Sequence, residues 1–207
     1  MRIHDVTRPV FSGMPVWPSD PPCRCGWSAR LAYNDGFNAA ELSFGAHTGT
    51  HMDGPLHVLE DGARIADVPL AACIGPAHVV DTAAEAAEIG AVWLSEHLPA
   101  GCERLLLRTR VWRDTESFPQ TWPALTPDAA RLLVGRGVRL VGMDAPSPDP
   151  FDSEDLPAHR VLLGAGIPII ENLLLDDVES GAYELIALPL RLVEADASPV
   201  RAVLVER

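Results

Sequence analysis

The strongest constraint on the fold is a series of short apolar runs, each about the length of one buried strand. These runs are Glu41–Phe44, Ala77–Val80, Arg104–Leu107, Val138–Val141, Ile167–Ile170, Tyr183–Ala187 and Val200–Val205. Loops and helix signals separate them, which is typical of a chain that alternates strands with helices. No apolar stretch reaches the roughly 18 residues that a membrane-spanning helix needs. We therefore expect the strands to form a central β-sheet.

Two segments carry helix signals. Thr126 is a suitable N-cap, and Pro127 and Asp128 suit the first turn that follows it. This helix is expected to end near residues 135–137, where two glycines can terminate it. A second helix is expected over Leu156–Gly164. The sequence thus predicts an α/β fold, with residues 1–207 forming a single domain that has its strands in the core and its helices outside.

The charge balance excludes several kinds of partner. The chain has 16 basic and 29 acidic residues, a net charge of −13, and every basic residue is arginine. Such a chain repels phosphate backbones, so we expect no nucleic-acid partner, and no apolar span points to a membrane. The first residues lack the apolar core of a secretory signal, so we expect a cytoplasmic location.

Four cysteines, Cys23, Cys25, Cys73 and Cys102, are too few and too scattered for a disulfide framework. We expect ordinary reduced thiols, which suits a reducing compartment. The alternative is that Cys23 and Cys25 bind a metal together, although the chain has no second cysteine pair at zinc-finger spacing.

The chemistry is concentrated in residues 47–57, which read His-Thr-Gly-Thr-His-Met-Asp-Gly-Pro-Leu-His. Three of the seven histidines of the chain and one aspartate fall within this segment. Imidazole and carboxylate are the ligands that zinc and similar divalent ions accept when no thiolate is present. The alternative is a group of unrelated loop histidines, but such a concentration favours a metal site.

The spacing within this segment indicates a local conformation. In an extended chain His47 and His51 would lie roughly 13 Å apart, whereas one helical turn would bring them to about 6 Å. Glycine and threonine disfavour a long helix here. We therefore expect a tight coil or a single turn around the ion, with Gly49 and Gly54 allowing backbone conformations that other residues resist. Asp53 could then reach the same ion.

Two distant residues are further candidates. His159 lies near the start of the second predicted helix, and Glu171 follows the apolar run Ile167–Ile170 at the carboxyl end of a predicted strand. Open α/β sheets place their sites at such strand ends. From spacing alone, His159 could equally be a surface residue and Glu171 a capping carboxylate.

At these residues the sequence resembles the bacterial kynurenine formamidases, which are members of the broader metal-dependent cyclase family. The resemblance covers nearly the whole chain. It is carried by Met14–Pro18, His47–His57, Gly142–Ser147, Asp155–His159, Gly166–Asn172 and Tyr183–Leu190. The histidine motif marks the broad family, and the flanking segments together point to the formamidase branch. The resemblance implies a cyclase-type swivelling fold with a mixed, barrel-like sheet, and a homodimer.

The resemblance also implies a site with two metal ions, usually zinc. His47, His51 and Asp53 would hold one ion, and Asp53 would also contact the second, which His159 would bind. Glu171 would contact both ions. Two other residues would act on the substrate, with His57 as the acid/base and Trp17 in the wall of the substrate pocket. From the residues alone, His57 could instead be a third metal ligand, and Trp17 could be plain core packing.

The implied reaction is the hydrolysis of N-formyl-L-kynurenine to L-kynurenine and formate, a step of tryptophan breakdown. A metal-activated water suits this reaction, and a histidine near its ordinary pKa can protonate the departing aryl amine. Two rival functions remain. One is a hydrolase of the same family that acts on another cyclic or aryl amide, such as an isatin-type substrate. The other is a metal-binding protein without catalysis, against which a surplus acid/base group beside the ligands argues.

Overall fold

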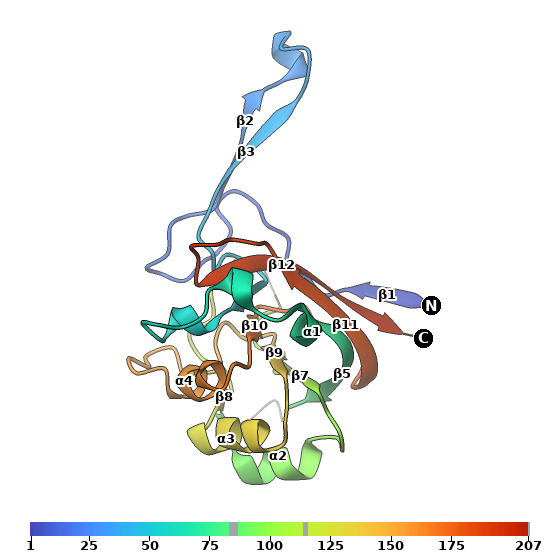
Figure 1. The fold of residues 1–207 in the computed structure, drawn as a ribbon. Helices are drawn as coiled ribbons and strands as arrows, with labels where there is room; N and C mark the ends of the chain where they lie inside the picture. Colours follow the sequence, from blue (N-terminus) through green and yellow to red (C-terminus); the bar gives the residue numbers. More distant parts are fainter. Residues whose placement is uncertain (83–86, 114–115, 207) are drawn as a thin grey trace.

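Within the described residues, seven strands close into a barrel of mixed direction. The computed structural model describes residues 1–82, 87–113 and 116–206 (Figure 1). The barrel strands are β4 (His51–Asp53), β5 (Ile74–Asp81), β7 (Arg104–Arg108), β9 (Leu140–Met143), β10 (Ile169–Glu171), β11 (Gly181–Pro189) and β12 (Ala197–Glu206). They run in the order β12-β11-β5-β7-β9-β10-β4, and β4 pairs with β12 to close the ring. This arrangement confirms the predicted α/β fold with a mixed, barrel-like sheet.

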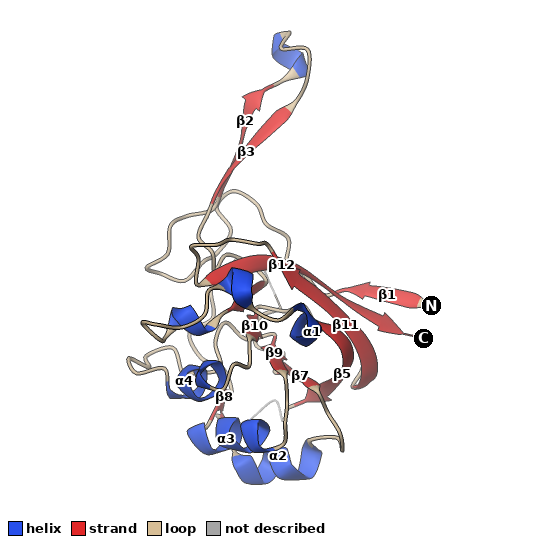
Figure 2. Cartoon of the chain, in the orientation of Figure 1, coloured by secondary structure: helices blue, strands red, loops and turns tan. Residues whose placement is uncertain are grey.

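Shorter elements surround the barrel. Strand β1 (Arg2–Asp5) pairs with β12 from outside the ring, and β6 (Glu88–Ile89) pairs with β8 (Ala124–Leu125). The α-helices are α1 (Leu70–Cys73), α2 (Ala91–His97), α3 (Pro127–Gly135) and α4 (Pro157–Gly164), and the short 3-10 turns are η1 (Leu31–Tyr33), η2 (Pro55–His57) and η3 (Ile65–Asp67). Helices α2, α3 and α4 lie together on one side of the barrel (Figures 1 and 2).

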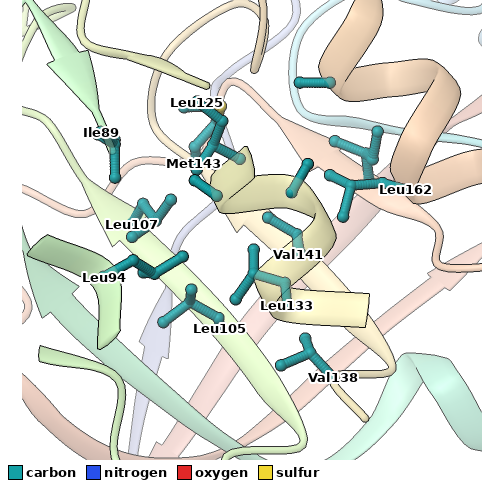
Figure 3. Packing of buried hydrophobic residues seen from close by; sticks show 14 of the residues in the cluster. Ile89, Leu94, Leu105, Leu107, Leu125, Leu133, Val138, Val141, Met143 and Leu162 are labelled. Atoms are coloured by element: carbon teal, nitrogen blue, oxygen red, sulfur yellow. The ribbon is translucent and has the colours of Figure 1, made fainter. Parts of the chain in front are cut away.

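Strand alternation divides the apolar side chains between two cores. The parallel strands β5, β7, β9 and β10 are covered on both faces, so their apolar runs are almost continuous. Leu106 packs with residues contributed by all seven barrel strands, in the barrel interior, whereas Leu105 and Leu107 pack against the helices. Figure 3 shows this second core, in which Leu133 of α3 and Leu162 of α4 face the sheet.

The barrel interior leaves no room for a side chain at one position of β9. A Cβ atom at Gly142 would lie 2.5 Å from Cδ2 of Leu106 and 3.0 Å from Cδ1 of Leu173. Both leucines are fully buried, so neither can move aside without opening a void. Gly142 therefore leaves the space that the side chains of Leu106 and Leu173 fill.

Both predicted helices are confirmed. The hydroxyl of Thr126 accepts a hydrogen bond from the backbone N–H of Ala129 at 3.2 Å, and Pro127 is the first helical residue of α3. Gly137 adopts φ +73° just beyond the end of this helix, as a C-terminal glycine does. Helix α4 covers the second predicted segment and begins at Pro157. Local capping signals were therefore sufficient to locate these two helices.

A hairpin stands away from the barrel (Figures 1 and 2). It consists of β2 (Arg24–Ala29) and β3 (Ala39–Ser43), joined by the loop that contains η1. Its exposed apolar side chains are Trp27, Leu31, Tyr33, Phe37 and Leu42. The prediction that Glu41–Phe44 belongs to the core sheet is therefore wrong. A short β-type run shows that a segment is extended, but it does not show which sheet the segment joins.

Two other expectations concern the state of the cysteines and the lack of a membrane-spanning helix. All four cysteines are free thiols; Cys25 is exposed, whereas Cys23, Cys73 and Cys102 are buried. Burial raises the pKa of the Cys73 and Cys102 thiols to about 11, so these groups stay protonated at neutral pH. In the described part of the chain, no helix has the length and apolar character needed to cross a membrane.

Candidate metal centre

The centre is built around β4, a strand of three residues that lies between the equally short β10 and the longer β12. β4 runs antiparallel to both β10 and β12, with His51 opposite Glu171 and Asp53 opposite Ala197. Met52 packs in the barrel interior, so the side chains of His51 and Asp53 extend from the other face of the strand. Strand pairing therefore brings His51, Asp53 and Glu171 to one place outside the barrel.

The chain reaches β4 through a tight turn, as expected for residues 47–50. The N–H of Thr48 donates to the carbonyl of Gly45 at 3.1 Å, and Gly49 adopts φ +67°, a left-handed conformation that favours glycine. The turn brings the rings of His47 and His51 to a centroid distance of 4.9 Å. The predicted tight coil or single turn holds only as far as residue 50, because His51–Asp53 form an extended strand.

The role predicted for Gly54 is wrong. Its φ of −100° and ψ of 167° are extended values that any residue adopts. Its lack of a side chain matters for packing instead, because a Cβ atom would lie 3.1 Å from the carbonyl oxygen of Asp196 and 3.3 Å from the backbone of Ile65. The N–H of Gly54 donates to that same carbonyl at 2.8 Å, which fixes the segment around Asp196 beside the site.

His159 enters the site from the first turn of α4. Its Nε2 lies 3.1 Å from Oε1 of Glu171 and 3.5 Å from Oδ2 of Asp53. Its Nδ1 lies 2.7 Å from Oδ2 of Asp149, and the carboxylate of Asp149 also accepts the backbone N–H groups of Ala158 and His159. Asp149 therefore fixes the helix start and the orientation of the imidazole together. This residue was not among the sequence candidates.

The structure brings all five predicted ligands together. His47 Nδ1 lies 3.0 Å from Oδ1 of Asp53, and His51 Nε2 lies 3.5 Å from that oxygen and 3.2 Å from Oε2 of Glu171. Ligand atoms of His47, His51 and Asp53 all lie within 4.8 Å of one another. Such a set of imidazoles and carboxylates has the composition that zinc and similar ions accept.

Buried polar atoms without a hydrogen bond indicate whether this set of predicted ligands fits a cation. Both carboxylate oxygens of Asp53 and Nε2 of His51 are buried without a hydrogen bond, and Asp53 is 0% exposed. A buried carboxylate without hydrogen bonds is costly unless positive charge compensates it. Burial lowers the pKa of His47, but the negative charges of Asp53 and Asp196 outweigh it and raise that pKa to about 11. The site thus attracts positive charge, and its donor set fits a divalent metal.

His57 lies at the edge of this cluster, on η2. Its Nδ1 lies 3.0 Å from Oδ2 of Asp196, and its ring centroid lies 4.4 Å from that of His47 and 5.4 Å from that of His159. The side chain is half-buried, with 25% of its area exposed. His57 therefore contacts the metal cluster and remains accessible from outside.

Asp196 is the second residue that the sequence did not reveal. It directly precedes β12, and its Oδ2 also lies 2.9 Å from Nε2 of His47. Hydrogen bonds from His47 and His57 hold the pKa of Asp196 well below its usual range, so it is a carboxylate at neutral pH. No local signal could have marked it, because 149 residues separate Asp196 from His47.

Asn172 is a third residue that sequence reasoning missed. It follows Glu171, is 4% exposed and adopts φ +60°. Its Nδ2 donates to the carbonyl of Gly49 at 3.0 Å, and the same carbonyl lies 2.9 Å from Nδ1 of His51. With Nδ1–H donating to this carbonyl, Nε2 of His51 is the nitrogen left to bind a metal. Asn172 thus helps to hold the backbone that orients His51.

A cavity of about 300 Å³ opens above the cluster. Its polar floor includes His47, His51, His57, His159 and Glu171. Its apolar wall includes Trp17, Trp112 and Phe118, and the ring of Trp17 lies 5.5 Å from that of Phe118. Trp17 therefore lies in the cavity wall, and its contact with a substrate stays a prediction. Trp112 lies in the wall as well, although no motif had marked it.

Comparison with known proteins places the chain in a family. The profile of the family Cyclase, described as "Putative cyclase", matches residues 4–150. The kynurenine formamidase of Salinibacter ruber is 44% identical over 207 residues, which cover 99% of this chain and 97% of that protein. A solved structure described as a "potential metal-dependent hydrolase with cyclase activity" is 32% identical, with a TM-score of 0.85 over 98% of this chain and 96% of that one.

A second solved structure has the same fold and is that of an enzyme with another activity. Isatin hydrolase A from Labrenzia aggregata, bound to benzyl benzoate, is 28% identical, with a TM-score of 0.84 over 100% of this chain and 94% of that one. This chain thus shares its fold with isatin hydrolase A, whereas its sequence is more similar to that of the formamidase. The chain belongs to the cyclase family, in the branch of the kynurenine formamidases.

Proposed function

We propose that this chain hydrolyses N-formyl-L-kynurenine to L-kynurenine and formate at the metal centre. The observation that carries the proposal is the position of His57, an additional half-buried imidazole beside the ligand cluster on the floor of an aromatic cavity. A purely structural metal site would need neither the cavity nor the additional histidine. The similarity to the Salinibacter ruber formamidase supports the choice of substrate.

Two zinc ions are proposed to occupy the cluster. His47, His51 and Asp53 would hold one ion, and His159 would hold the other. Asp53 and Glu171 would bridge them, which suits the two unsatisfied oxygens of Asp53 and the position of Glu171 between His51 and His159. When bound, the ions supply a water of lowered pKa and positive charge for the developing oxyanion.

His57 is proposed as the acid/base. The reaction breaks the bond between the formyl carbon and the aryl nitrogen, and this nitrogen leaves far more easily once it is protonated. If Nδ1–H of His57 donates to Asp196, Nε2 is the nitrogen that exchanges the proton with the substrate. Asp196 thus fixes the tautomer and the ring orientation. The aryl ring of the substrate would lie against Trp17, Trp112 and Phe118.

Two further proposals concern the oligomeric state of the chain and its location in the cell. The chain is proposed to form a homodimer, because the apolar side chains of β2 and β3 are exposed in the single chain. It is proposed to act in the cytoplasm, where its free thiols would remain reduced. Light scattering of the purified protein tests the first proposal, and fractionation of the native cells tests the second.

A substrate comparison tests the proposed function. Metal-loaded protein is assayed with N-formyl-L-kynurenine and with isatin, and kcat/KM is measured for each. We expect the formylated amine to be preferred about 100-fold or more, which is within the range that specific polar contacts provide. A preference for isatin would instead assign the chain the activity of its structural neighbour. Turnover of neither substrate would contradict the proposed function.

A further inference from the structure

A tight turn places two cavity residues side by side. The backbone N–H of Asp20 donates to the carbonyl of Trp17 at 2.8 Å, which closes a four-residue turn over residues 17–20. Pro18 occupies the second position, where its fixed φ favours such a turn. Both ends of the turn line the cavity above the metal cluster. The turn therefore presents an aromatic ring and a carboxylate to the same bound molecule.

The carboxylate of Asp20 is unpaired. Within residues 1–82, 87–113 and 116–206, no side chain forms an ion pair or a hydrogen bond with it. Glu171, another carboxylate of the cavity lining, has His51 and His159 as partners at 3.2 and 3.1 Å. Asp20 is half-buried, so part of its hydration is lost without a compensating charge from the protein.

The charges around the cavity define what Asp20 can bind. No arginine is among the described residues that line the cavity, and the chain contains no lysine. Because Asp20 is negatively charged and no arginine or lysine neutralises it there, it repels a substrate carboxylate and attracts a cation. An ammonium group suits it best, because an ammonium donates charge-assisted hydrogen bonds to a carboxylate.

The proposed substrate carries such a group at a suitable place. N-formyl-L-kynurenine has an aryl ring with the formamido group, and on the adjacent ring carbon a short chain that ends in an α-amino acid. With the formamido group at the metal cluster and the ring against Trp17, this chain would lie in the same cavity, which Asp20 also lines. We propose that Asp20 binds the α-ammonium group of the substrate and makes the enzyme selective for aryl formamides that carry an amine. This inference rests on the proposed function.

The contact is expected to affect binding more than chemistry. The ammonium group is separated from the scissile bond by the ring and several carbon atoms, so its interaction changes little between substrate and transition state. Loss of Asp20 should therefore raise KM and leave kcat nearly unchanged. Isatin-type cyclic amides carry no ammonium group, so Asp20 contributes nothing to their binding.

The test combines one variant with two substrates. The substrates are N-formyl-L-kynurenine and its deamino analogue, which differs only in a hydrogen in place of the α-ammonium group. In metal-loaded Asp20→Asn, kcat/KM for the first substrate should fall about 10- to 100-fold, mainly through KM, as expected for one hydrogen bond to a charged group. For the analogue, wild type and variant should agree within about twofold, because neither makes the contact.

A control variant isolates the effect of net charge. Asp152→Asn removes one exposed carboxylate outside the lining of this cavity, so it should behave as wild type with both substrates. Equal losses for both substrates in Asp20→Asn, or no loss for either, would overturn the role of Asp20 and leave the proposed function intact. If the wild-type protein hydrolysed neither substrate, both the role of Asp20 and the proposed function would be overturned.

Discussion

The carboxylate of Asp196 lies 3.0 Å from Nδ1 of His57, on the side of the imidazole that does not face the substrate in the proposed mechanism. A carboxylate in this position fixes the tautomer and the orientation of a catalytic histidine. Asp196 also lies 2.9 Å from Nε2 of His47, so one side chain holds two imidazoles of the site.

Asp196→Asn should lower turnover about 10- to 100-fold, as is typical when a group that orients a metal site is lost. The amide keeps the size of the side chain but removes its charge, so it can no longer accept charge-assisted hydrogen bonds from both imidazoles. The measurement is kcat for N-formyl-L-kynurenine at saturating zinc, with metal per chain determined in parallel. Wild-type turnover in this variant would show that Asp196 does not orient His57.

His57→Ala should retain its metal and its fold yet lose about 10²- to 10⁴-fold in turnover, the range of a general acid/base group. The defect should shrink for formanilides whose amine leaves readily without a proton. The measurement is kcat for a series of substituted formanilides, together with elemental analysis. Loss of bound metal would instead identify His57 as a ligand, a role that its proximity to Asp53 and His159 also permits.

Asp53→Ala and Glu171→Ala should each lower the metal content more than the loss of any other carboxylate. A bridging carboxylate compensates two cations at once, so its loss leaves them repelling each other at close range. Metal per chain is counted after dialysis, and Asp152→Ala serves as the control because its carboxylate is exposed. Full metal content in either site variant would refute the bridging role of that residue.

A pH-dependent part of the stability is expected from Asp81, at the end of β5. Hydrogen bonds from Arg108 lower its pKa to about 2, from an ordinary value of 3.8, and partial burial opposes this shift. Because the folded state holds the lower pKa, the contribution is complete above about pH 4 and is lost as the pH falls through about 2. The contribution of Asp81 to the free energy of unfolding therefore decreases toward acid pH and does not depend on pH near neutrality.

Asp81→Asn should therefore lower Tm at pH 7 by about 2–4 °C, which corresponds to roughly 1 kcal/mol for a partly exposed pair in a domain of this size. The difference from wild type should narrow between about pH 4 and pH 2. Thermal melts across this range measure it, with Asp152→Asn as the control because its carboxylate is exposed and lies outside the helices and strands. A constant difference down to pH 2 would contradict the assignment.

Local signals predicted a large part of the fold. The runs that became β5, β7, β9, β10, β11 and β12 are apolar because both faces or one face of each strand is buried, and Thr126 caps α3 through a contact three residues away. Strand β4 was missed because three residues are too few to show a period, and because His51 and Asp53 break its apolar pattern.

The sequence likewise predicted some residues of the site and not others. Residues 47–57 were recognisable because their ligands lie close together in the sequence, and His159 and Glu171 became strong candidates only through the family resemblance. Asn172 and Asp196 act on partners more than 100 residues away, which only the barrel brings near. Asp149 lies ten residues before His159, but no local pattern marked it as the partner of that imidazole. Tertiary structure, and not local pattern, decides which polar residues support a metal ligand.

The central claim is that this cluster is a catalytic metal centre, and metal removal tests it most directly. Protein treated with a chelator is titrated with zinc, or with manganese or cobalt, while metal per chain and hydrolysis of N-formyl-L-kynurenine are measured in the same samples. The account predicts no hydrolysis in metal-free protein and full recovery at about two ions per chain. Full activity in protein that elemental analysis shows to be metal-free would contradict it.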